Sequence, residues 1–209
     1  MHRSTTKDIA PFLLVFTCFL LGFYLLEDEN FFIIDCETAL MRVLMQLPFL
    51  AVMIVIPLRA PREDRRRLGW VRPGWKDIPL TLALFTSTVL VGVLLPPTIS
   101  THRPRLILGC TSIPFLLMAV FSAATEELLF RSWLIYNLEN LGGGGIPALL
   151  ISTIVFSIVH SWQGIPAMAL ALAAGLIYAS VFQCYRSIVP LIAAHAAHNI
   201  FALILIFRS

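Results

Sequence analysis

The stretch Ala123–Arg131 reads Ala-Ala-Thr-Glu-Glu-Leu-Leu-Phe-Arg and places three charged side chains inside an otherwise apolar run. Glu127 and Arg131 are four positions apart, so they share one face of a helix and can pair. Glu126 points about 100° away from Glu127 and is free to face a cavity. Because charges are expensive inside a membrane, these residues are functional candidates if the run crosses a bilayer.

The composition indicates that lipid surrounds most of the chain. Of 209 residues, 58% are hydrophobic and 13% are charged, and the mean hydropathy is +0.86. Soluble domains usually carry about 25% charged residues, and one of this size could not hide so much apolar surface. A typical soluble domain, a disordered chain, a basic nucleic-acid-binding domain and a disulfide scaffold are therefore excluded.

Runs without Asp, Glu, Lys or Arg predict about seven transmembrane helices, within a range of six to eight. A spanning helix needs about 20 apolar residues, and lipid cannot satisfy the hydrogen bonds of any other open backbone. We therefore expect an all-α, polytopic transmembrane helical bundle. The runs are Ile9–Leu26, Val43–Leu58 (which can extend back past Arg42), Ile78–His102, Leu106–Thr125, Asn140–Tyr185 (long enough for two spans) and Ser187–Phe207.

The distribution of basic residues predicts a cytoplasmic N-terminus. The segment Arg59–Lys76 holds seven Lys or Arg residues, whereas Glu27–Glu37 holds five acidic residues and no basic one. Cytoplasmic loops carry the excess of positive charge, so seven spans then place the C-terminus outside. The first run lacks a small-residue cleavage site and predicts an uncleaved anchor. The basic segment is expected to face lipid headgroups, with specific binding of anionic lipid or nucleic acid as the alternative.

Two smaller features concern glycine and cysteine. Gly142–Gly145 lacks the lysine of a phosphate-binding loop and predicts a flexible turn between two spans. The four cysteines are far apart in sequence and are expected to be reduced, buried thiols.

Two more apolar runs carry polar side chains. One contains Phe156-Ser-Ile-Val-His160, and the last contains His195-Ala-Ala-His198-Asn199. His195 and Asn199 lie on one helix face, with His198 offset from it. A carboxylate near two imidazoles can hold and deprotonate a water, and a histidine or asparagine donor can stabilise an oxyanion. Water-mediated peptide hydrolysis inside a membrane requires such a set.

These residues match three motifs of one family, in its order. The motifs are Glu126-Glu127-x-x-x-Arg131, Phe156-x-x-x-His160 and His195-x-x-x-Asn199. The chain therefore resembles the CAAX-protease and bacteriocin-processing (CPBP, Abi) family, the Rce1-like intramembrane endopeptidases. The resemblance covers about residues 115–201.

The resemblance implies a division of the chain and a role for each motif residue. Residues 1–105 would be N-terminal spans with a basic cytoplasmic loop at 59–77, and residues 106–209 a catalytic core. The catalytic set would be Glu126, His160, His195 and Asn199. Glu126 and His160 would activate water, and His195 and Asn199 would bind the oxyanion or assist. The supporting set would be Glu127, Arg131 and His198.

Structural readings of the same residues remain open. Glu126 could be a second partner of Arg131, and His160 could be a satisfied core histidine. His195 and Asn199 could form an interhelical hydrogen-bond pair.

Metal-free catalysis by glutamate is favoured, and no cofactor is expected. Zinc remains possible, with Glu126, His160 and His195 as ligands. The chain has no His-Glu-x-x-His helix, and asparagine is a poor zinc ligand.

The expected function is an intramembrane endopeptidase that cleaves a membrane-associated peptide or protein tail. The alternatives are a non-catalytic bacteriocin-immunity or membrane-binding protein, and a proton-coupled transporter. The lipid bilayer is an expected partner, and nucleic acid is not. Because the chain is short and has few loops outside the membrane, we expect it to lie in a prokaryotic cytoplasmic membrane.

The depth of the motifs presents one difficulty. Simple span counting places Glu126 near the cytoplasmic end of its helix and His160 near the opposite end of the next. The two meet only if the first helix runs from about Ser112 to Tyr136 and the second starts late.

Overall fold

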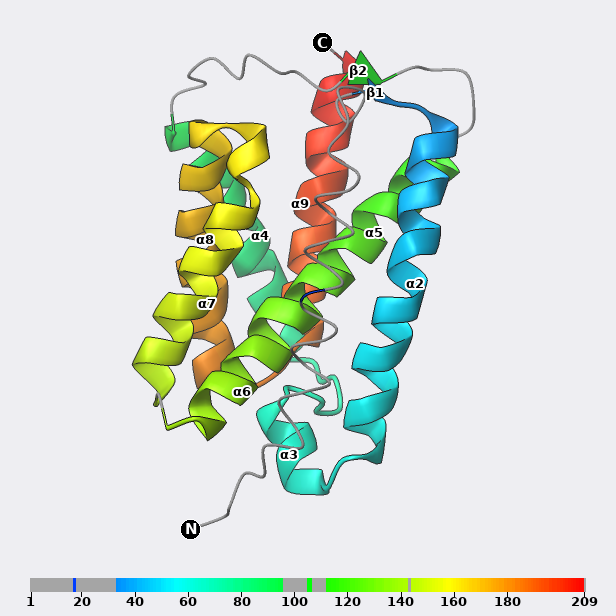
Figure 1. The fold of residues 1–209 in the computed structure, drawn as a ribbon. Helices are drawn as coiled ribbons and strands as arrows, with labels where there is room; N and C mark the ends of the chain where they lie inside the picture. The colour runs from blue at the N-terminus through cyan, green and yellow to red at the C-terminus, as the bar shows by residue number, and fades with distance from the viewer. Residues whose placement is uncertain (1–16, 18–32, 96–104, 107–111, 143, 209) are drawn as a thin grey trace.

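The computed structural model describes residue 17 and residues 33–95, 105–106, 112–142 and 144–208. Within these ranges the chain is a bundle of helices (Figure 1) with one parallel pair of two-residue strands, β1 and β2. The all-α prediction is confirmed. The elements are β1 (Ile33–Ile34), α2 (Cys36–Arg59), α3 (Arg62–Arg67), α4 (Asp77–Leu94), β2 (Arg105–Leu106), α5 (Ile113–Glu127), the π-helix η2 (Leu128–Leu134), α6 (Ile135–Asn140), α7 (Gly145–Val159), the 3₁₀ turn η3 (Ser161–Gln163), α8 (Ile165–Tyr185) and α9 (Val189–Arg208).

Four helical segments are long and apolar enough to cross a membrane, and they indicate an integral membrane protein. They are Cys36–Arg59, Asp77–Leu94, Ile113–Asn140 and Ile165–Tyr185. The apolar helices Gly145–Val159 and Val189–Leu205 are shorter. The predicted span 9–26 lies outside the described residues, so the count of about seven stays a prediction.

Helix α2 begins earlier than the charge-free run suggested. Asp35 caps it, because its carboxylate accepts the Thr38 backbone N–H at 2.8 Å and the Thr38 hydroxyl at 2.8 Å. These hydrogen bonds hold the pKa of Asp35 below its usual range. The end of the acidic segment therefore contributes the cap and first turn of a helix.

The cysteine prediction is wrong at the start of the same helix. Cys36 is disulfide-bonded, whereas Cys184 is free and exposed. Separation along the chain does not show which cysteines lie close together in space, so this bond could not be predicted from the sequence.

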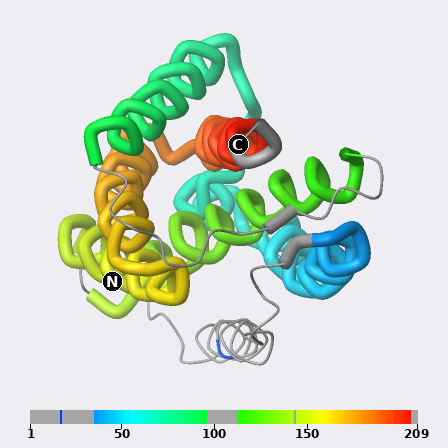
Figure 2. Tube along the Cα trace, turned by 90° about the horizontal axis from the view of Figure 1, so that it is seen from above, coloured from blue at the N-terminus to red at the C-terminus, as the bar shows by residue number. Residues whose placement is uncertain are grey.

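The helices pack in a defined order around the centre of the bundle. Helix α5 lies between α2 and α9, α7 pairs with α8, and α4 covers α8 and α9; Figure 2 shows this arrangement from above. The largest apolar side chains of the core include Phe130, Ile135, Phe182 and Leu191, each fully buried. The helices of residues 36–94 thus pack directly on those of 113–208, and the boundary at 105 stays a prediction.

The glycine run forms the turn between α6 and α7. Gly142 has φ +87° and Gly144 has φ +65°. Side chains other than glycine rarely adopt positive φ, so these two glycines allow a short connection between antiparallel helices.

Candidate active site

The hairpin that this turn creates brings Glu126 and His160 to one depth. Glu126 lies at the midpoint of the segment Ile113–Asn140, about 21 Å from its end at a rise of 1.5 Å per residue. Helix α7 begins at Gly145, and His160 caps its C-terminus, about 22 Å from its start. The two arms of the hairpin, Glu126 to Asn140 and Gly145 to His160, thus have nearly equal length. The Nε2 atom of His160 lies 3.9 Å from Oε2 of Glu126. The expected long helix and late start of its partner are thus confirmed.

Helix α9 brings a second imidazole to the same carboxylate oxygen. The Nε2 atom of His195 lies 3.7 Å from Oε2 of Glu126. That oxygen is buried and accepts no hydrogen bond from the described residues. The side chains of Glu126, His160 and His195 retain 19%, 18% and 14% exposure, so a small molecule can still reach them.

The end of α7 fixes the orientation of the His160 ring. The backbone N–H of His160 bonds to Ser157 at 3.0 Å, which tightens the last turn and leaves the Phe156 carbonyl available. The Nδ1–H of His160 donates to that carbonyl at 2.7 Å. In the neutral ring Nε2 is therefore the unprotonated nitrogen, and it faces Glu126.

Glu127 and Arg131 orient the His195 ring in a comparable way. The Nδ1–H of His195 donates to Oε1 of Glu127 at 2.8 Å, and the Arg131 guanidinium lies 3.3 Å from the same oxygen. Glu127 and Arg131 are 0% and 1% exposed. This buried pair therefore determines where His195 points. The π-helix that begins at Leu128 and contains Arg131 is entirely buried, and such segments are frequent at functional sites.

Two aromatic rings frame this pair, and neither belongs to the predicted catalytic or supporting sets. The Phe156 ring lies 4.1 Å from the Arg131 guanidinium carbon and 4.6 Å from the His160 ring. Tyr178 lies 5.9 Å from the same carbon and 6.1 Å from the His195 ring. Its hydroxyl contacts Thr88 of α4 at 3.4 Å. The sequence signal that could have identified Tyr178 is a polar aromatic residue three positions after Gly175 in an apolar helix.

Asn199 and His198 form no hydrogen bond to this centre among the described residues. The Asn199 amide donates to the Ala119 carbonyl of α5 at 3.3 Å, and it forms no hydrogen bond to Glu126 or either imidazole among the described residues. The Nδ1 atom of His198 is buried, and the described residues offer it no hydrogen-bond partner. The geometry thus brings together Glu126, His160 and His195, with Glu127 and Arg131 behind them.

The described residues contain no group of three His, Cys, Asp or Glu side chains with the geometry of a metal site. The donor set of Glu126, His160 and His195 is spaced at 3.7 and 3.9 Å. This spacing suits a water molecule that forms a hydrogen bond of about 2.8 Å to each partner.

Comparison with known proteins identifies one family. Residues 109–201 match the model of the family described as "Rce1-like: Type II CAAX prenyl endopeptidase Rce1-like". Those residues include every helix that contributes to the site. The predicted resemblance is confirmed over this range. No curated protein and no solved structure matches the chain.

Proposed function

We propose that this chain, an integral membrane protein whose residues 109–201 match the Rce1-like CAAX endopeptidases, hydrolyses peptide bonds of membrane-associated substrates by activating a water molecule on Glu126. The observation that carries the proposal is the buried Oε2 atom of Glu126. It has no hydrogen-bond donor among the described residues, yet two imidazole Nε2 atoms lie within 4 Å of it.

A water between Glu126 and His160 would donate one proton to each. Both partners are acceptors, because the Nδ1 proton of His160 already serves the Phe156 carbonyl. The lone pair of the water oxygen then remains free to attack a scissile carbonyl. As the new C–O bond forms, Glu126 takes a proton, and it returns this proton to the leaving amine when the C–N bond breaks.

The oxyanion requires a donor on the opposite side of the attacked carbon. In its imidazolium form His195 would present an Nε2–H to the centre, with Glu127 stabilising the charge from Nδ1. The Asn199 amide has two N–H groups, so it could hold the Ala119 carbonyl with one and donate the other to the oxyanion. Its contact with Ala119 fixes α9 against α5.

Substitution of Glu126 tests this mechanism. In a deletion strain we expect wild-type protein to restore specific new termini in the membrane and secreted proteome. Glu126→Gln should lower their formation by about 10²–10⁴-fold, because general base catalysis is lost. Glu63→Gln, an exposed carboxylate of α3, is the matched control and should behave as wild type. Equal restoration by Glu126→Gln would refute the proposal and favour a non-catalytic membrane-binding protein.

A chelator distinguishes the zinc-dependent alternative. The zinc-dependent mechanism would hold the metal through Glu126, His160 and His195, and zinc would polarise the bound water. We expect cleavage by the purified full chain to survive prolonged treatment with 1,10-phenanthroline. Loss of cleavage that zinc then restores would replace the metal-free mechanism.

We also propose that the basic end of the bundle faces the cytoplasm of a prokaryotic cell. The disulfide at Cys36 supports this orientation, because disulfides persist in oxidising compartments and Cys36 begins a helix that ends at the basic segment 59–76. Cys184 is free, exposed and near the basic end of α8. A membrane-impermeant maleimide should label it in inverted vesicles and not in right-side-out vesicles, and the opposite pattern would reverse the orientation.

The substrate proposed is a peptide or protein tail at the membrane. A compact chain suits bacteriocin or signalling peptides and the C-terminal anchors of surface proteins. The family description supports prenylated tails as the third class. The sequences of the new termini in the deletion experiment would show which of the three substrate classes is cleaved.

A further inference from the structure

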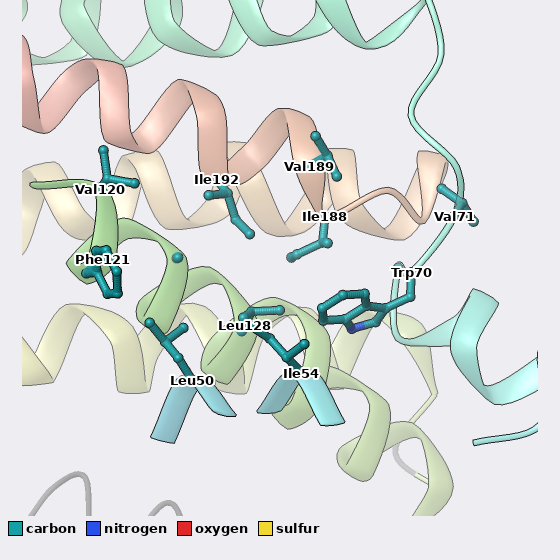
Figure 3. A pocket seen from close by; sticks show the side chains of 12 residues that line it. Leu50, Ile54, Trp70, Val71, Val120, Phe121, Leu128, Ile188, Val189 and Ile192 are labelled. Atoms are coloured by element: carbon teal, nitrogen blue, oxygen red, sulfur yellow. The ribbon is translucent and has the colours of Figure 1, made fainter. Parts of the chain in front are cut away.

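An apolar cavity of about 330 Å³ lies between α2, α5, α9 and the segment after α3. Figure 3 shows its walls, which include Leu50 and Ile54 of α2, Leu128 of η2, Ile192 of α9, and Trp70. The cavity is partly open, and its walls are almost entirely apolar, so they offer water very few hydrogen-bonding partners. A hydrocarbon chain is therefore the kind of ligand that suits these walls.

The cavity is separate from the candidate active site. Ala124 and Leu128 line it, and Glu126 lies between them in sequence, about 200° from each around the helix. An occupant of the cavity would thus contact the opposite face of α5 from the one that presents the Glu126 carboxylate.

One polar atom at the wall lacks a partner. The indole N–H of Trp70 is buried and has no hydrogen-bond acceptor among the described residues. An unpaired buried donor is destabilising, and an oxygen from a bound molecule would satisfy it. Tryptophan is also enriched at membrane interfaces, where ester and phosphate oxygens lie.

Basic residues lie on both sides of this tryptophan in the sequence. The backbone N–H of Trp70 bonds to the Arg65 carbonyl at 2.8 Å, and Arg72 follows the cavity residue Val71. Among the described residues, Arg65, Arg66 and Arg72 form no ion pair, unlike Arg67, which lies 3.6 Å from Glu139. Three unpaired guanidinium groups therefore lie within five residues of Trp70.

The wall that carries Trp70 is held rigidly against the bundle. The Ser132 hydroxyl donates to the Leu68 carbonyl at 2.6 Å, and the Ile188 N–H donates to the Gly69 carbonyl at 3.0 Å. Gly69 has φ +80°, and a Cβ atom there would lie 2.6 Å from the Phe182 ring. The site is thus formed before any ligand arrives.

We propose that this cavity binds an anionic phospholipid. One acyl chain fills the apolar space, an ester or phosphate oxygen accepts the Trp70 indole N–H, and Arg65 and Arg72 neutralise the headgroup. Basic pockets between membrane helices bind anionic headgroups in this way. The inference concerns a different site from Glu126 and does not depend on catalysis.

Native mass spectrometry of the purified full chain tests the proposal, with dioleoyl phosphatidylglycerol and dioleoyl phosphatidylcholine as probes. We expect wild type to retain phosphatidylglycerol at least about fivefold better than phosphatidylcholine. Ile54→Trp should fill the cavity and lose the bound lipid. Val55→Trp, which places the same side chain at an exposed position of α2, should retain it. Glu126→Gln should bind lipid as wild type does.

The headgroup contacts are tested separately with Arg65→Gln/Arg72→Gln. This double variant should still bind lipid but lose the preference for phosphatidylglycerol. Thermal unfolding verifies that each variant folds, and Leu50→Phe replaces Ile54→Trp if the latter does not. Equal retention of the two lipids by wild type, or unchanged lipid in a folded cavity-filling variant, would overturn the proposal. So would a cavity variant that alters only the apparent KM for substrate, because it would identify a substrate pocket.

Discussion

Helix α4 and the long segment Ile113–Asn140 have similar hydropathies of 1.8 and 1.6, yet they occupy different environments. Only 11% of the most apolar window of α4 is buried, against 50% for the long segment. Hydropathy therefore identifies both as membrane helices and does not reveal which one lies inside the bundle. The buried charges at Glu127 and Arg131 mark the interior helix, because lipid would not accept them.

The comparison also separates two uses of polar groups in a membrane. Helix α4 carries Ser87, whose hydroxyl donates to the Ala83 carbonyl of its own helix at 2.7 Å. The long segment instead shares its polar groups with other helices, since Glu127 binds His195 of α9. A change at Glu127 should thus propagate to the site, whereas a change at Ser87 should remain local.

The largest effect is expected at Arg131. Arg131→Met leaves the Glu127 carboxylate buried without its guanidinium, and removing one partner of a buried pair costs about 3–5 kcal/mol. Denaturant unfolding of the purified chain measures this loss. Arg66→Met, at an exposed position of α3, removes the same charge and should unfold as wild type does. A stable Arg131→Met variant would show that the pair is dispensable.

An intermediate effect is expected at Gly175 of α8, behind the same guanidinium. A Cβ atom there would lie 3.1 Å from Thr153 and 3.6 Å from Nη2 of Arg131. Gly175→Ala should destabilise by about 1–3 kcal/mol through overpacking and lower kcat by displacing Arg131 and thus His195.

Helix α4 supplies the matched control for this change. A Cβ atom at Gly92 would meet only Leu170, at 4.0 Å. Gly92→Ala should therefore be neutral or stabilise the helix by up to about 1 kcal/mol. If both alanines behaved alike in thermal unfolding and in kcat, close packing at Gly175 would not position the site.

The smallest effect is expected on the lipid-facing side of α4. Leu90 is 55% exposed, and in a membrane its side chain meets lipid in both the folded and unfolded chain. Leu90→Ala should change the free energy of unfolding by less than about 0.5 kcal/mol. A loss of several times that size would mean that another part of the protein covers this face.

Much of the fold follows from charge-free runs, and less of the site does. The run Asn140–Tyr185 predicted two helices, but the break at Gly164, with φ +94°, and the length of each arm were needed to place His160. Glu127–Arg131 follows from four-residue spacing. The contacts of Phe156 and Tyr178 with Arg131 do not, because apolar helices give little indication of which face meets which neighbour.

Two contacts that the sequence did not predict have the same origin. The bond of Cys36 and the contact of Asn199 with Ala119 both depend on how segments distant in sequence approach each other. Motif spacing determines which residues share a helix face, and it leaves the distance to the next helix undetermined.

The equal arms of the α6–α7 hairpin restrict where the chain can change length. One residue added within α7 would turn His160 by about 100° and move it 1.5 Å along the axis, away from Glu126. Residues added beside Gly142 and Gly144 would alter neither arm. Insertions and deletions should therefore be tolerated in the turn and excluded from both arms unless they occur in compensating pairs.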